Sequence, residues 1–129
     1  MTREFANFVQ VYCDGKPGAR HPKHLVCRFR EDGFTPGKFQ AFAWFSEPDS
    51  NGNQKTFGGL KSRPAFKGLD IGCPVKPGEI SCRLHLEIRE GSRMEAKLFG
   101  RLEQLLDHAE TRRQEHEDIS LSMLIAILM

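Results

Sequence analysis

The sequence lacks several features that assign a protein to a functional class. No run of residues reaches the ~18 consecutive apolar positions that a membrane-spanning helix needs, and residues 1–7 lack the charged-then-apolar pattern of a secretory signal. The sequence also has no glycine-rich phosphate loop, no G-x-S-x-G nucleophile elbow and no H-E-x-x-H zinc-protease motif. We therefore expect a cytoplasmic protein that does not enter a membrane and is not an enzyme.

Cysteine is scarce, and its spacing excludes the commonest zinc pattern. The four cysteines stand at positions 13, 27, 73 and 82, so no C-x-x-C pair occurs. In a reducing compartment disulfides are disfavoured, which leaves metal binding or burial in the core for each cysteine.

The chain carries little net charge, but that charge is unevenly distributed. It is +2 overall, whereas residues 1–69 hold 11 Lys and Arg against 6 Asp and Glu, and residues 70–129 hold 8 against 11. Such a split is typical either of a surface that meets phosphate or an acidic partner, or of ordinary solvated faces. The length of 129 residues and the 39% of apolar residues indicate one domain.

The pattern of apolar residues predicts an α+β domain over residues 1–129, with a β-rich part over 1–90 and a helical part over 92–129. We expect a small antiparallel sheet of four to five strands, with a basic hairpin loop over residues 14–24, because glycine and proline interrupt that stretch. Strands are expected at residues 5–13, 25–30, 39–45 and 80–89, with a short one at 56–60.

Two helices are expected to cover the sheet. Ser92 and Glu95 form a capping box, and apolar residues then recur at helical spacing, which predicts a helix from Arg93 to Gln114. A short terminal helix over residues 119–129, capped by Asp118 or Ser120, is apolar nearly all round. It must be buried in this domain or against another chain. In the second case a homodimer would form through Leu121, Leu124, Ile125 and Leu128.

Two histidines and two cysteines indicate a structural zinc site. Cys82 and His85 form a C-x-x-H pair, and the other half would come from Cys13 with either His21 or His24. Thiolate and imidazole ligands suit zinc better than magnesium or calcium. In a regular strand Cys82 and His85 would point to opposite faces, so this site requires the chain to turn between them. Cys27 is expected in the core, and Cys73 fits either role.

Parts of the sequence resemble a family of small zinc-knuckle-like proteins from actinobacteria and their phages. The resemblance lies in Val11-Tyr12-Cys13-Asp14-Gly15, in His21-Pro22-Lys23-His24, and in the terminal segment from Ile119 to Leu128. The family places a C-x-x-C before its amphipathic helix, whereas this chain has His85 at the second cysteine. The resemblance implies a zinc ligand set of Cys13, His21, Cys82 and His85.

A cluster of basic residues supplies the candidate binding surface. Tyr12 and Phe34 lie near it in the sequence as stacking groups, whereas the alternation of the strand predicts that Phe29 points inward. The cations are Lys16, Arg20, Lys23, Arg28 and Arg30. We expect a non-catalytic accessory protein that engages a host protein through the basic hairpin or the apolar tail. The alternative is a zinc-stabilised protein that binds nucleic acid.

Overall fold

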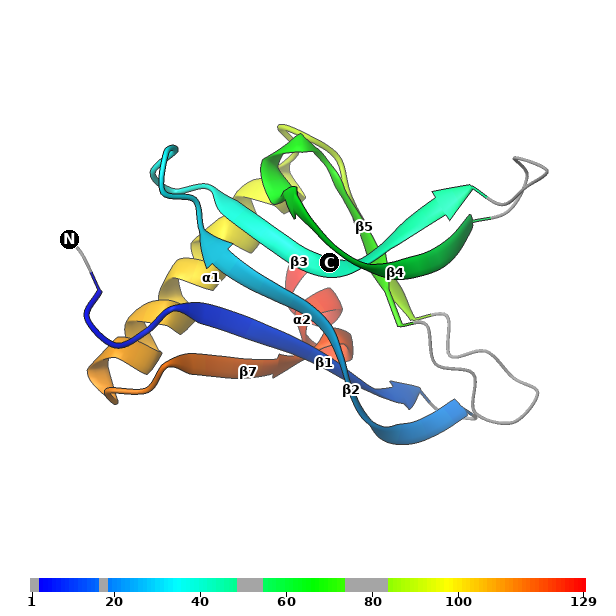
Figure 1. The fold of residues 1–129 in the computed structure, drawn as a ribbon, viewed down its shortest axis with the longest axis horizontal. Helices are drawn as coiled ribbons and strands as arrows, with labels where there is room; N and C mark the ends of the chain where they lie inside the picture. The colour runs from blue at the N-terminus through cyan, green and yellow to red at the C-terminus, as the bar shows by residue number, and fades with distance from the viewer. Residues whose placement is uncertain (1–2, 17–18, 49–54, 74–83) are drawn as a thin grey trace.

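The fold is a mixed β-sheet with two helices behind it, which confirms the α+β class (Figure 1). The computed structural model describes residues 3–16, 19–48, 55–73 and 84–129. The strands are β1 (Phe8–Lys16), β2 (Ala19–Glu31), β3 (Phe39–Pro48), β4 (Lys55–Pro64), β5 (Leu69–Gly72), β6 (His85–Ile88) and β7 (His116–Ser120). The helices are α1 (Arg93–Thr111) and α2 (Leu121–Leu128), and a single 3-10 turn (Ala65–Lys67) joins β4 to β5.

The sheet contains more strands than the four to five predicted, and it is not wholly antiparallel. In the described part six strands follow the order β6-β5-β3-β2-β1-β7, and the seventh, β4, pairs with β3 outside this order. β1 and β7 run parallel, because α1 passes behind the sheet and returns the chain to its far edge in the direction of β1. Neither helix among the described residues is long and apolar enough to cross a membrane.

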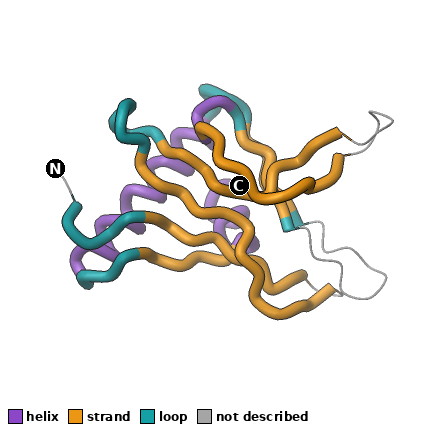
Figure 2. Tube along the Cα trace, in the orientation of Figure 1, coloured by secondary structure: helices purple, strands orange, loops and turns teal. Residues whose placement is uncertain are grey.

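The core lies between one face of the sheet and the two helices. On that face of the sheet Val9, Val11 and Phe29 are fully buried. Leu102 of α1 and Leu124 of α2 are fully buried on the helices that pack against it. Figure 2 shows both helices on the same side of the sheet, so neither of these two helices covers the opposite face of β1, β2 and β3. The predicted inward positions of Cys27 and Phe29 are confirmed, since both side chains have no exposed surface.

Helix α1 begins as predicted and ends earlier than predicted. The Ser92 hydroxyl accepts a hydrogen bond from the Glu95 amide at 3.2 Å, and the Glu95 carboxylate accepts one from the amide of Gly91 at 3.3 Å. The helix ends at Thr111 instead of Gln114, because Arg113 adopts a left-handed conformation with φ of 55° that turns the chain toward β7.

The apolar tail is part of the core of its own chain. Leu121 and Leu124 have no exposed surface, and Leu128 has 1%. These three leucines therefore face the core of their own chain. Of the four residues predicted as a homodimer surface only Ile125 is half-buried, and the homodimer stays a prediction. Ser120, one of the two predicted caps, begins the terminal helix, and its hydroxyl accepts a hydrogen bond from the Met123 amide at 3.2 Å. The helix therefore starts at Leu121, two residues later than predicted. Ile119 belongs to β7, where it is the one buried residue.

The predicted basic loop over residues 14–24 is wrong, since most of it continues the strands of a hairpin. Cys13 to Lys16 pairs with Ala19 to His24, whereas β7 pairs with β1 only as far as Tyr12 and β3 pairs with β2 only from Cys27. We call the two segments 13–16 and 19–24 the arm. Pro22 is tolerated here because it lies at an irregularity in the β1–β2 register, between the pairs Cys13–His24 and Gly15–Arg20, where it has no cross-strand partner.

Candidate metal centre

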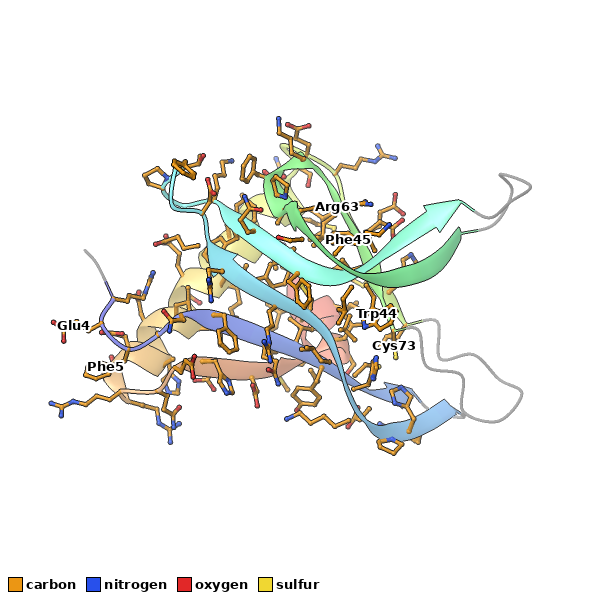
Figure 3. All side chains as sticks on the ribbon, viewed as in Figure 1. Glu4, Phe5, Trp44, Phe45, Arg63 and Cys73 are labelled. Carbon is orange, nitrogen blue, oxygen red and sulfur yellow. The ribbon has the colours of Figure 1, made fainter. Side chains whose placement is uncertain are left out.

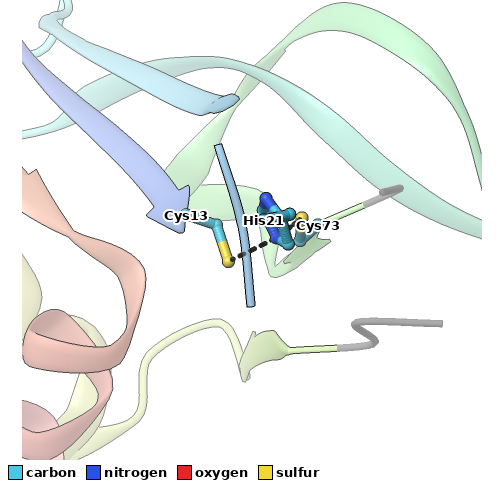
Figure 4. Close-up of side chains that lie close together, drawn as sticks. All are labelled: Cys13, His21 and Cys73. Atoms are coloured by element: carbon cyan, nitrogen blue, oxygen red, sulfur yellow. Dashed lines mark hydrogen bonds between the residues drawn. The ribbon is translucent and has the colours of Figure 1, made fainter. Parts of the chain in front are cut away.

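Three potential metal ligands meet where the arm approaches the end of β5 (Figures 3 and 4). The ligand atoms of Cys13, His21 and Cys73 all lie within 4.8 Å of one another. His21 Nε2 is 3.6 Å from the Cys13 sulfur and 3.4 Å from the Cys73 sulfur. Both cysteines are buried, with 1% and 2% of their surface exposed, and His21 is half-buried. The three residues can bind a metal ion.

The two sulfur–nitrogen distances match the edge of a coordination tetrahedron. Bonds of about 2.3 Å to sulfur and about 2.0 Å to nitrogen, separated by the tetrahedral angle, place a sulfur and a nitrogen about 3.5 Å apart. The two measured sulfur–nitrogen distances, 3.6 and 3.4 Å, lie on either side of that value. The side chains therefore need little movement to share one ion.

Backbone groups orient two of the three ligands. His21 Nδ1 lies 2.8 Å from the Pro22 carbonyl oxygen, so its N–H donates to that oxygen and leaves a lone pair on Nε2, which faces the cysteines. The Gly15 amide donates to the Cys13 sulfur at 3.3 Å, a contact that favours the thiolate. Gly15 has a φ of 101°, a conformation that side chains rarely adopt, so glycine allows the turn that aims this amide.

The structure brings together only part of the ligand set that the resemblance implies. Cys13 and His21 meet, whereas Cys82 lies outside the described residues and its role stays a prediction. His85 is exposed on β6 and lies with Asp70 and Glu87 instead. Because His85 pairs with Gly72, it points to the opposite face of the sheet from the adjacent Cys73.

Cys73 is the ligand that the resemblance omits, although the residues alone left it open as a ligand. It directly follows the four-residue strand β5, and its amide donates to the Leu84 carbonyl at 2.9 Å, which continues the β5–β6 ladder. The one local signal is its position between Gly72 and Pro74, where a strand ends. That signal does not reveal a partner 52 residues away in the chain.

His24, the alternative to His21, and Cys27, expected in the core, lie in other environments. Cys27 is fully buried, and this burial raises the pKa of its thiol well above the ordinary value, as expected for a core residue. Burial and the nearby His21 lower the pKa of His24, whose ring packs against Trp44 with centroids 5.9 Å apart. Neither residue joins the group of Cys13, His21 and Cys73 within the described part of the chain.

The predicted basic residues divide into two sets. Arg20 and Lys23 lie on the arm. The Arg20 guanidinium is 4.0 Å from the Asp14 carboxylate, and the Lys23 ammonium is 3.3 Å from the Asp118 carboxylate. Arg28 and Arg30 lie on the body of β2 and are exposed. The backbone of Lys16 ends β1, and its side chain is not among those described.

Comparisons with protein-family models, with curated proteins and with solved structures each found no match to this chain. What the protein does must therefore be inferred from its own side chains.

Proposed function

We propose that the protein is a small non-catalytic binding protein in which a structural zinc ion fixes the arm to strand β5. The observation that carries this proposal is the convergence of Cys13, His21 and Cys73 with tetrahedral spacing. Two thiolates and one imidazole favour zinc over magnesium and calcium, which prefer oxygen ligands. The fixed arm would present Arg20 and Lys23 to a partner macromolecule.

Two features support a structural rather than a catalytic role for this ion. Among the described residues no carboxylate joins the ligand group, so the site lacks the general base that accompanies many catalytic zinc ions. In addition, an isolated two-stranded hairpin is marginally stable in water, and the arm has no third strand within the described residues. A metal crosslink between the arm and β5 supplies the missing stabilisation.

The test is the zinc content of protein purified without chelator. We expect about one zinc per chain for the wild type. The Cys13→Ser and Cys73→Ser variants should each lose most of this zinc. Cobalt substituted for zinc should give the visible absorption of a tetrahedral thiolate complex. Cys27→Ala is the matched control, because it removes a buried cysteine that is not in the ligand group. Zinc well below one per chain in the wild type, or full zinc in Cys73→Ser, contradicts the proposal.

A further inference from the structure

The sheet face opposite the helices carries a groove that the metal centre does not use. Strand pairing places Arg28 beside Gln10 and Phe42, and Arg30 beside Gln40, and all of these alternate with core-facing residues. A hollow of about 540 Å³ lies over this part of the face. The groove is lined by Phe8, Arg28, Arg30, Phe34, Gln40 and Phe42, together with Asp32 and Ser62.

Aromatic rings in the groove are exposed to solvent. Phe34 has 96% of its surface exposed and Phe42 has 40%, although burial of a phenylalanine side chain contributes about 1.5–3 kcal/mol to folding. Phe8 stacks on His116, with ring centroids 5.0 Å apart and planes 10° from parallel. Flat rings left in a groove provide surfaces on which a planar ligand can stack.

The same groove carries positive charge that the protein does not neutralise. Within the described part of the chain, neither Arg28 nor Arg30 forms an ion pair, in contrast to Arg20 and Lys23 on the arm. The Arg28 guanidinium lies over the Phe8 ring, 5.0 Å from its centroid, which leaves its edge free to donate hydrogen bonds.

Asp32 supplies the one carboxylate of the groove, and it is already engaged. Its Oδ1 atom accepts a hydrogen bond from the side-chain amide of Gln40 at 3.1 Å. Hydrogen bonds from Thr35 and Gln40 lower the pKa of Asp32, so its charge is −1 at neutral pH. Two guanidinium groups therefore face one carboxylate, and the groove complements a ligand that combines negative charge with planar rings.

We propose that this groove binds single-stranded nucleic acid, with phosphates at Arg28 and Arg30 and bases stacked on Phe34 and Phe42. Bases in a duplex are already stacked on one another and do not offer their faces to side chains, whereas a single strand does. The inference goes beyond the proposed function and requires only that the chain is a binding protein, because the groove contains none of the candidate zinc ligands.

The test is fluorescence anisotropy with a labelled 12-nucleotide pyrimidine strand, as DNA and as RNA, titrated with the full chain over a range of salt. At least one strand should bind, with an affinity that falls as salt rises. The slope of log affinity against log salt is negative, and in the R28Q/R30Q double variant it should become shallower by about 1.4, since each lost phosphate contact removes about 0.7 from its magnitude. Arg93→Gln is the matched control, because Arg93 is exposed on α1 behind the sheet and should leave the slope unchanged.

Substitutions of Phe34 test the contribution of stacking to binding separately from that of charge. They should leave the fold intact, because the Phe34 side chain is almost entirely exposed. Phe34→Leu, which keeps an apolar side chain but loses the flat ring, should weaken binding about five-fold or more. Phe34→Trp keeps a flat ring and should bind at least as well as the wild type.

Three results would overturn the inference: no binding at low salt, a duplex bound as tightly as the single strand, or wild-type affinity in both R28Q/R30Q and Phe34→Leu. Zinc content measured on the same samples distinguishes this failure from failure of the proposed function. A protein without zinc that still binds the strand refutes only the zinc proposal.

Discussion

Strands β1 and β2 pass through two regions of this protein that are stabilised in different ways. In the body of the sheet they have partners on both sides, and residues such as Val9 and Phe29 are buried under the helices. In the arm the same two strands pair only with each other among the described residues. Burial of apolar surface can stabilise the body. The arm contacts the rest of the protein through the group of Cys13, His21 and Cys73 and through the ring of His24, which packs against Trp44.

This difference gives a crosslink between Cys13, His21 and Cys73 more weight in the arm than a crosslink would have in the body. A region with a helix behind it gains stability from each buried apolar side chain, so a crosslink there adds little. A two-stranded projection has too few neighbours to bury much surface, so the zinc ion that we propose would contribute a large share of its stability. Substitutions in the two regions should therefore have separable effects.

The largest effect is expected in the body. Leu124→Ala should lower the free energy of unfolding by about 2–5 kcal/mol, because Leu124 is fully buried and its truncation leaves a cavity against the sheet. Urea unfolding measures this change. Met123→Ala is the control in the same helix, since Met123 is 59% exposed and should change stability by less than about 0.5 kcal/mol. Equal losses in the two variants would show that α2 does not pack as described.

A smaller and local effect is expected from removal of the zinc ion that we propose. Chelation, or Cys73→Ser, should release the arm, so that the amides of Gly15 and His24 exchange hydrogen faster while those of Val9 and Phe29 remain protected. Native-state hydrogen exchange followed by NMR resolves these amides individually. If the amides of arm and body lose protection together, the two regions form one cooperative unit and the contrast between them is wrong.

The smallest effect concerns the start of the chain and depends on pH. The Glu110 carboxylate accepts hydrogen bonds from the amides of Glu4, Phe5 and Ala6 at 2.7–2.8 Å, and these bonds, with Ala6 contributing most, lower its pKa below the ordinary 4.5. A lowered pKa stabilises the fold at pH above the ordinary value, and this contribution is lost as pH falls through the pKa of the folded state.

Glu110→Gln should therefore be less stable than the wild type at pH 7, and the difference should shrink as the pH falls below 4.5. Urea unfolding at several pH values measures it. Glu90→Gln is the matched control, because Glu90 is exposed and should show no such dependence. A difference between Glu110→Gln and the wild type that persists unchanged at low pH would rule out the carboxylate as its source.

Local sequence patterns correctly predicted features that depend on residues close together in the chain. The alternation around Phe29 gave its inward position correctly, and the Ser92–Glu95 capping box located the start of α1. The residues placed Cys13 on one hairpin with either His21 or His24, and the structure brings Cys13 to 3.6 Å from His21. Strand β7 was missed, since it buries only Ile119 and so has almost no apolar alternation. The arm was mistaken for a loop because glycine and proline usually end strands, and here they occur where one strand edge has no partner.

The sequence by itself determined the α+β class, the core-facing positions of the longer strands and the ligand chemistry of two residues in the arm, because each depends on neighbours within a few turns or one hairpin. Only the tertiary structure decided that β7 runs parallel to β1, that the apolar tail is buried in its own chain, and that Cys73 joins Cys13 and His21. These three features depend on how separate segments of the chain pack together, and such contacts are set by the order of strands in the sheet rather than by spacing along the chain.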